Sequence, residues 1–156
     1  FWIIFWNSDG YSAEGVVYIT AAAVPKGQTL MGKYKTLLSQ TSAEHANEPS
    51  SDGKYRVLTS SIKAIGSNEV CTHSYLTVGA FDTMVQAENV AAYLKTKFVR
   101  FLALQTLTSI HVSKNTFCFV PMQDFTTSWS DTKLYEKYGL TQEEIGFIES
   151  LIKPLE

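Results

Sequence analysis

The sequence predicts an α+β fold: a small mixed or antiparallel sheet with long loops, a central long helix and a C-terminal helical tail. Short β-branched and aromatic runs, separated by turn residues, fill most of the first half. An amphipathic stretch without Gly or Pro covers residues 83–107, and two helix-capping signals follow residue 129. We expect a single domain over 1–156, with a short helical extension over 130–156.

The expected strands are short, and one long polar loop interrupts them. Residues 1–6 and 15–20 are expected to pair as a hairpin, because Asn7–Gly10 between them has turn chemistry. Residues 39–53 contain no large apolar side chain, and loops of that length in compact domains are functional or disordered. The other strands are expected at 34–38, 55–58, 61–65, 70–78 and 117–120.

The stretch 83–107 has an apolar stripe at helical spacing, and we expect one long helix or two consecutive ones. Asp82 or Thr83 can cap its start, and Gln86 lies three residues after Thr83, as a capping box requires. Lys95, Lys97 and Arg100 are expected at the edges of the stripe, with their charged groups in water. They form either a solvated helix face or an edge that meets phosphates.

Two further helices are expected in the tail. Ser130 has the chemistry of an N-cap, and Gly139 is suited to end that helix. Thr141 and Glu144 match a capping box for the second helix, which should run to about residue 153 and stop at Pro154.

The composition is that of a globular domain, since 45% of the 156 residues are hydrophobic. No apolar run approaches the ~20 residues that a membrane helix needs, so no membrane partner is expected. The chain opens on Phe1 without an initiator Met or a signal peptide, and we infer a piece of a longer protein. Two cysteines, Cys71 and Cys118, are too few for a disulfide framework, which favours a reducing, cytoplasmic location.

Charge is distributed unevenly along the chain. Between Lys26 and Lys114 there are ten cations and six anions, a balance of +4. Between Asn115 and Glu156 there are three cations and seven anions, a balance of −4. A basic middle and an acidic end are typical of a protein whose anionic partner binds on one side.

The known catalytic motifs are missing. There is no Gly-rich phosphate loop, no HExxH and no Asn/Asp-Pro-Pro-aromatic tetrapeptide, and the histidines are scattered. We therefore predict no catalytic residue and no metal ligand in this chain. Two acid-x-Lys pairs, Asp52-Gly53-Lys54 and Asp131-Thr132-Lys133, leave a metal-dependent nuclease domain as an alternative. A protein-interaction module is a second alternative.

Polar and basic residues in the first half suit DNA recognition better than catalysis. Lysine and arginine can hold phosphates, while hydroxyl, amide and imidazole groups can read base edges. The alternative for each histidine is a surface or structural role. The candidate phosphate contacts are Lys33, Lys35, Lys54, Arg56 and Lys63, and the candidate base contacts include Thr41, Ser42, His45, Asn47 and His73.

Several stretches, in order, resemble a known family. They are Tyr34–Lys35 leading into Ser39–Asn47, Tyr55–Leu58, Glu69–Leu76, Tyr93–Leu102, Phe119–Phe125 and Leu134–Thr141. From about Val16 to Leu155 the chain resembles the C-terminal target-recognition region of bacterial type II restriction–modification adenine methyltransferases. It is similar to the TaqI-like specificity domain and, more distantly, to the halves of type I specificity subunits.

The resemblance implies a division of labour within a longer parent protein. A preceding catalytic domain would bind S-adenosylmethionine and methylate adenine, and some relatives also carry a nuclease, with its Mg²⁺. The chain in hand would hold no cofactor; its partners would be double-stranded DNA and that methyltransferase domain of the same chain. Residues 34–47 and 55–74 match the DNA-facing portion, which adds Thr72 and Ser74 to the candidate DNA contacts.

Overall fold

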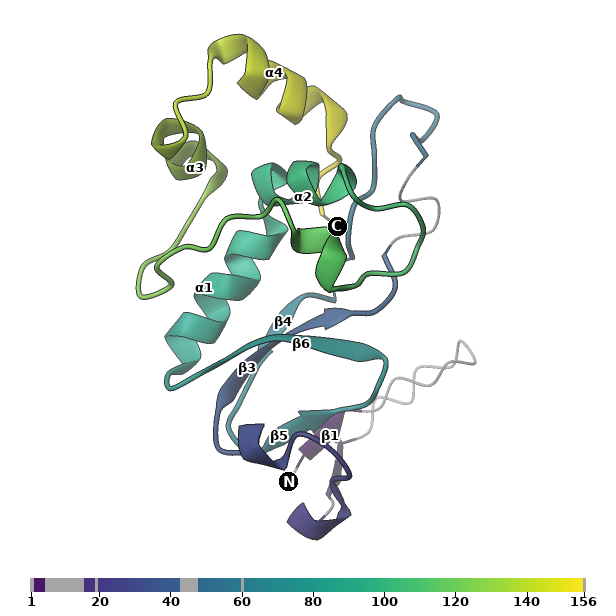
Figure 1. The fold of residues 1–156 in the computed structure, drawn as a ribbon, viewed down its shortest axis with the longest axis vertical. Helices are drawn as coiled ribbons and strands as arrows, with labels where there is room; N and C mark the ends of the chain where they lie inside the picture. The colour runs from purple at the N-terminus through teal and green to yellow at the C-terminus, as the bar shows by residue number, and fades with distance from the viewer. Residues whose placement is uncertain (1, 5–15, 19, 43–47, 60, 156) are drawn as a thin grey trace.

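The computed structural model describes residues 2–4, 16–18, 20–42, 48–59 and 61–155 of the chain. Within them, two three-stranded sheets lie at one end of the molecule and the C-terminal helices at the other (Figure 1). The fold is α+β, the class that the sequence predicts.

The first sheet has the strand order β2-β1-β5. β1 (Trp2–Ile4) pairs antiparallel with β2 (Val16–Tyr18), as expected, and parallel with β5 (Glu69–Cys71). Two short 3₁₀ turns, η1 (Ala21–Ala23) and η2 (Gln28–Leu30), follow β2.

The second sheet is antiparallel throughout, in the order β4-β3-β6. Its central strand, β3 (Tyr34–Ser39), lies between β4 (Lys63–Ile65) and β6 (Tyr75–Phe81). The register of β3 against β6 shifts between Thr36 and Leu37, which places a bulge in the middle of the sheet.

The expected single strand over 70–78 is wrong. The turn Thr72–Ser74 divides it into β5 and β6, and the Tyr75 amide donates to the Thr72 carbonyl at 3.2 Å. The two halves then pair with strands of different sheets. Three consecutive polar residues form this turn, because short polar side chains favour turns over a half-buried strand.

The strand expected over 55–58 is also wrong. Only Tyr55 makes a β-bridge, to Ile152 at the end of the chain. Leu58 has φ of 62°, a left-handed conformation that no strand residue adopts.

The strand expected over 117–120 is a 3₁₀ turn instead, η3 (Lys114–Phe117), followed by further turns. The Thr116 hydroxyl oxygen accepts from the Ser113 amide at 3.1 Å, and the Val120 amide donates to the Phe117 carbonyl at 3.0 Å. Local side-chain bonding therefore overrides the β propensity of this aromatic run.

The stretch 83–107 forms two helices, α1 (Met84–Lys95) and α2 (Lys97–Leu104), and of the two candidate caps, Asp82 and Thr83, it is Thr83 that caps the first. Thr96, in an extended conformation, ends one helix and caps the other. Its hydroxyl donates to the Tyr93 carbonyl at 2.7 Å and accepts from the Val99 amide at 3.3 Å. The Thr96 hydroxyl thus gives the Val99 amide, at the start of α2, the acceptor that a carbonyl would provide inside a helix.

Helix α1 packs on one face of the second sheet, as Figure 1 shows. The buried Thr36 hydroxyl on β3 donates to the Ala87 carbonyl of α1 at 2.7 Å. The main core joins this layer to α2 and the tail through 17 buried side chains. Its largest fully buried members are Leu38, Val57, Leu58, Ile62, Val99, Leu134 and Ile152.

Arg100 does not lie at an exposed helix edge, as expected, but is only 2% exposed. Its Nε donates to the carbonyls of Lys95 at 3.1 Å and Thr96 at 3.3 Å, and its Nη1 donates to the Lys153 carbonyl at 2.6 Å. Burial lowers the pKa of the guanidinium, and the negative charge of Asp131 partly offsets this effect. The cation thereby joins the end of α1 to the C-terminal segment. Lys97 forms an ion pair with Glu149, and of the three cations only Lys95 is exposed.

The tail contains α3 (Asp131–Lys137) and α4 (Gln142–Leu151), with the predicted caps. Gly139 has φ of 63° at the end of α3, and Thr141 and Glu144 form the predicted capping box of α4. No helix in the described ranges has the length and apolarity that crossing a bilayer requires.

Asp131 begins α3 but also caps α2. Its carboxylate accepts from the amides of Lys97 at 3.1 Å and Phe98 at 2.8 Å. The substitution Asp131→Ala should leave both amides unpaired and lower the free energy of unfolding by about 1–3 kcal/mol. Urea unfolding measures this loss, with Glu136→Ala, an exposed acid on the same helix, as the control. Equal stability of the two variants would rule out this capping role.

Candidate nucleic-acid interface

The predicted polar residues converge where β3 continues beyond Ser39. The Gln40 amide donates to the Ser74 carbonyl at 2.9 Å, and the Gln40 carbonyl accepts from the Val112 amide at 2.8 Å. One residue of the extended strand therefore holds two segments that are distant in sequence. We call Ser39–Ser42, Thr72–Ser74 and Ile110–Val112 together the Gln40 junction.

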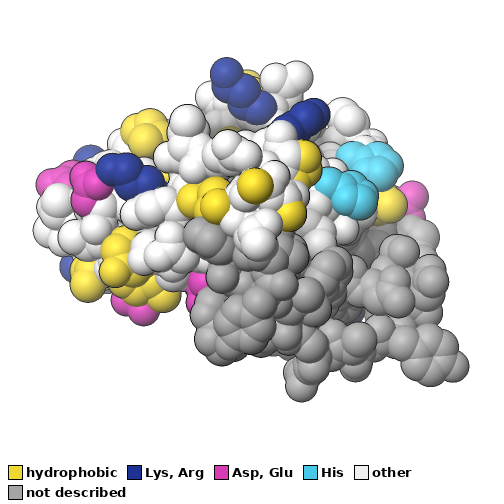
Figure 2. Space-filling view, turned by 90° about the horizontal axis from the view of Figure 1, so that it is seen from below, with side chains coloured by type: hydrophobic (Ala, Val, Ile, Leu, Met, Phe, Trp, Pro, Cys, Tyr) yellow, Lys and Arg dark blue, Asp and Glu magenta, His cyan; other side chains and the backbone are white. Residues whose placement is uncertain are grey.

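The exposed side of the Gln40 junction carries hydroxyl and imidazole groups. Thr41 forms a β-bridge with His111, and both are exposed, as are His73 and Ser74. The hydroxyls of Ser39 and Thr41 lie 3.1 Å apart and share a hydrogen bond. Figure 2 shows that both described histidines are exposed on the face of the molecule that is seen from below. This surface presents the donor and acceptor types that read base edges.

Lys63 borders the junction. Its ammonium lies 5.2 Å from the centre of the Tyr75 ring, and Tyr75 is the partner of Ser39 in the register of β3 and β6. Burial raises the pKa of the Tyr75 hydroxyl, which keeps the ring neutral. The aromatic face thus holds one predicted phosphate contact next to the predicted base contacts.

Lys54 and Arg56 lie on a segment that is anchored to the end of the chain. The backbone amide of Tyr55, between them, donates to the Leu151 carbonyl at 2.8 Å, and the Tyr55 carbonyl accepts from the Lys153 amide at 3.0 Å. Arg56 is exposed and Lys54 is half-buried. The backbone then continues to Leu58, whose amide donates to the Ser42 hydroxyl at 2.8 Å, so this segment reaches the Gln40 junction.

Ser42 and Thr72 belong to the junction but not to its exposed surface. Ser42 is buried, and its hydroxyl is occupied by the Leu58 amide. The Thr72 hydroxyl oxygen is buried without a hydrogen-bond partner in the structure. The Ser42 hydroxyl therefore holds the loop backbone at Leu58, and neither hydroxyl faces solvent where a base could approach.

Lys33 and Lys35 lie toward the other end of β3. Lys33 forms an ion pair with Asp82. Lys35 is 4% exposed, and its ammonium donates to the carbonyls of Lys33 at 2.6 Å and Leu30 at 3.1 Å. Burial is the main cause that lowers its pKa. Lys35 is therefore a structural cation, and a phosphate contact would cost it these buried bonds.

The two remaining predicted contacts, His45 and Asn47, fall outside the described residues. His111, Ser39 and Gln40 were not predicted as site residues. No local motif marks them, because only the backbone pairing of Thr41 with His111 brings these segments together.

Both acid-x-Lys pairs have structural partners. Asp52 accepts from the Lys54 amide at 3.2 Å and forms an ion pair with Lys153 at 3.2 Å, while Asp131 caps α2. In the part of the chain that the structure describes, no three His, Cys, Asp or Glu side chains gather as metal ligands.

The Ser42–Leu58 bond should be required for the shape of the junction. Ser42→Ala removes the acceptor of the buried Leu58 amide, whose residue has a left-handed backbone conformation. The substitution should lower the free energy of unfolding by about 1–3 kcal/mol. Thr41→Ala, its exposed neighbour, should change stability by less than about 0.5 kcal/mol. Chemical unfolding of the two variants compares them, and a neutral Ser42→Ala would show that the hydroxyl is dispensable.

Comparison of this chain with protein-family models, with curated proteins and with solved structures found no match. The geometry of the Gln40 junction is accordingly the basis for a functional assignment.

Proposed function

We propose that this chain is a DNA target-recognition module that reads base edges with the Gln40 junction. The observation that carries the proposal is the convergence of Thr41, His73, Ser74 and His111 on one exposed surface. These four side chains offer donors and acceptors in several directions, as recognition in the major groove requires. Strand β3, which leads into the junction, is paired on both sides and packs against helix α1.

The phosphate contacts in this proposal are Lys63, Lys54 and Arg56. No hydrogen bond or ion pair occupies the charged groups of Lys54 and Arg56 in the described part of the chain. The ammonium of Lys63 rests on a ring, which leaves its N–H donors available. Lys33 and Lys35 are not part of the proposed contact, because other groups in the fold already hold them.

The resemblance to target-recognition regions of restriction–modification adenine methyltransferases supplies the biological setting of the proposal. A methyltransferase domain of the same parent protein would bind S-adenosylmethionine and perform the chemistry in a cytoplasmic setting. The chain described here would select the sequence. A nuclease function is not favoured, because Asp52 and Asp131 are engaged in a turn and a helix cap.

Binding of random duplex DNA should weaken linearly in the logarithm of the salt concentration, with a slope of about 0.9 per phosphate contact. Arg56→Gln and Lys63→Gln should each weaken binding to all sequences and reduce that slope by about one contact. Fluorescence anisotropy across a salt series measures both quantities. Lys133→Gln, an exposed cation on α3, is the matched control and should bind as the unmodified chain does. Absence of binding at about 50 mM salt would refute the proposal for the isolated chain.

Base readout makes a separate prediction. Substituting His73 or Thr41 by Ala should leave the salt slope unchanged but relax the preference for a selected site, by about 1–3 kcal/mol per lost base contact. Selection from a randomised duplex pool, followed by competition between selected and random DNA, measures that preference. Unaltered selectivity in both variants would show that the junction does not read bases.

A further inference from the structure

A groove of about 500 Å³ lies between α2 and the N-terminal half of α4, away from the Gln40 junction. Its floor is apolar: α2 contributes Phe101 and Leu102, and the α4 side contributes Leu140, Phe147 and Ile148. No residue of the junction lines it. The bond from Arg100 to the Lys153 carbonyl holds the chain beyond α4 beside α2.

The groove exposes an aromatic side chain that the fold leaves half uncovered. Phe147 is 55% exposed, and its ring meets that of Phe101 edge to face with centroids 6.0 Å apart. Aromatic rings of this kind in a concave apolar surface are the usual anchors of protein interfaces. A partner that covered Phe147 would remove this ring from water.

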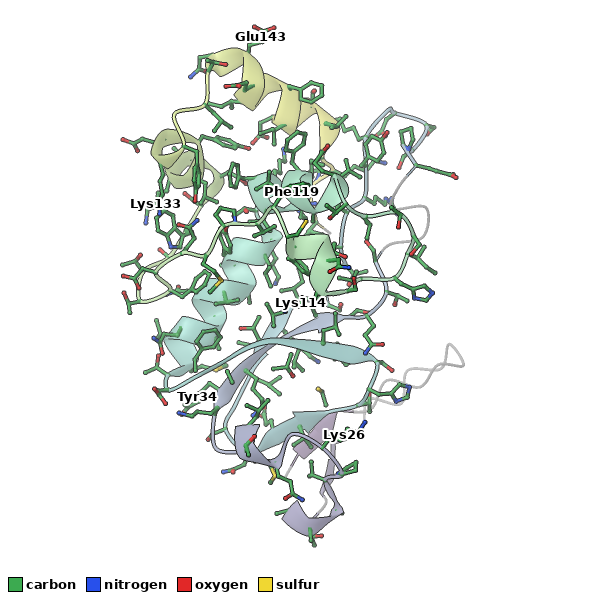
Figure 3. All side chains as sticks on the ribbon, in the orientation of Figure 1. Lys26, Tyr34, Lys114, Phe119, Lys133 and Glu143 are labelled. Carbon is green, nitrogen blue, oxygen red and sulfur yellow. The ribbon has the colours of Figure 1, made fainter. Side chains whose placement is uncertain are left out.

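Among the described residues that line the groove, the rim is acidic and holds no cation. Glu143 and Glu144 are the only charged residues among those that line it. The Glu144 carboxylate is fixed by the Thr141 amide at 2.8 Å and the Thr141 hydroxyl at 2.9 Å, and these bonds lower its pKa, so it is ionised at neutral pH. Glu143 extends outward from the first turn of α4, as Figure 3 shows, and has no ion pair with any described residue.

We propose that this groove binds an amphipathic helix with a basic rim, supplied by a partner protein. The apolar floor between two helices suits side chains at three- and four-residue spacing on a third helix. The two carboxylates select lysine or arginine beside that apolar stripe. They also repel phosphates, so the groove is separate from the proposed DNA surface and does not depend on it.

The test uses a labelled helical peptide of roughly 18 residues, in which Leu recurs at three- and four-residue steps among Lys and Ala. A second peptide of the same pattern carries Glu in place of Lys. Fluorescence anisotropy with the full chain should detect binding of the basic peptide, and the acidic peptide should bind about tenfold more weakly or not at all. Phe147→Ser and Glu143→Lys should each weaken binding of the basic peptide by about tenfold.

Phe119→Ser is the matched control, because Phe119 is 62% exposed and does not line the groove. It should leave peptide binding unchanged, and thermal unfolding checks that every variant is folded. Equal binding of both peptides, or equal loss in the control variant, would overturn the proposal. So would a concentration-dependent doubling of mass that Phe147→Ser abolishes, because the occupant would then be a second copy of the chain. DNA binding measured on Glu143→Lys in parallel separates the fate of this groove from that of the DNA surface.

Discussion

The break between α1 and α2 is the constraint on which the rest of the structure depends. A helix that starts inside a protein must satisfy its first amide groups, and α2 does so completely. Asp131 accepts from the amides of Lys97 and Phe98, the Thr96 hydroxyl from Val99, and the Thr96 carbonyl from Arg100. Because Asp131 is also the first residue of α3, one carboxylate fixes the position of the tail against the central helices. On the α1 side of the same break, the carbonyls of Lys95 and Thr96 accept from the Arg100 guanidinium.

This arrangement explains why the basic middle of the sequence is not an equally basic surface. Folding uses Arg100 and Lys35 as buried donors to backbone carbonyls, where a cation satisfies several acceptors at once. Lys33 and Lys97 are held in ion pairs with Asp82 and Glu149. A count of charges along the chain therefore overstates the cations available to a polyanion, and the proposed phosphate contacts reduce to those near the Gln40 junction.

Local chemistry made much of the fold predictable, and non-local pairing set the limit. The caps at Thr83, Ser130 and Thr141 and the left-handed Gly139 were predicted correctly, because each depends on residues within one helical turn. The division of residues 70–78 between two sheets was missed, because it is decided by β1 and β3, which are distant in sequence. Thr41 and His73 were predicted as site residues from their polarity and Ser74 from the resemblance, whereas His111 joins them only through its bridge to Thr41. Burial of Lys35 was also invisible, since its acceptors are main-chain carbonyls that no residue type reveals.

The two proposed binding surfaces differ in charge and polarity, and this difference constrains their partners. The Gln40 junction is polar and has Lys63 at its border, while the groove between α2 and α4 is apolar and has carboxylates at its rim. The phosphate backbone of DNA is attracted by the cation at the Gln40 junction and repelled by the carboxylates at the groove, and a basic helix has the opposite preference. The segment that carries Lys54 and Arg56 is bonded through the Tyr55 backbone to Leu151 and Lys153, at the C-terminal end of α4 and not at the groove. Leu151 and Lys153 do not line the groove, so a partner that covered Phe147 would leave the segment with the proposed phosphate contacts in place.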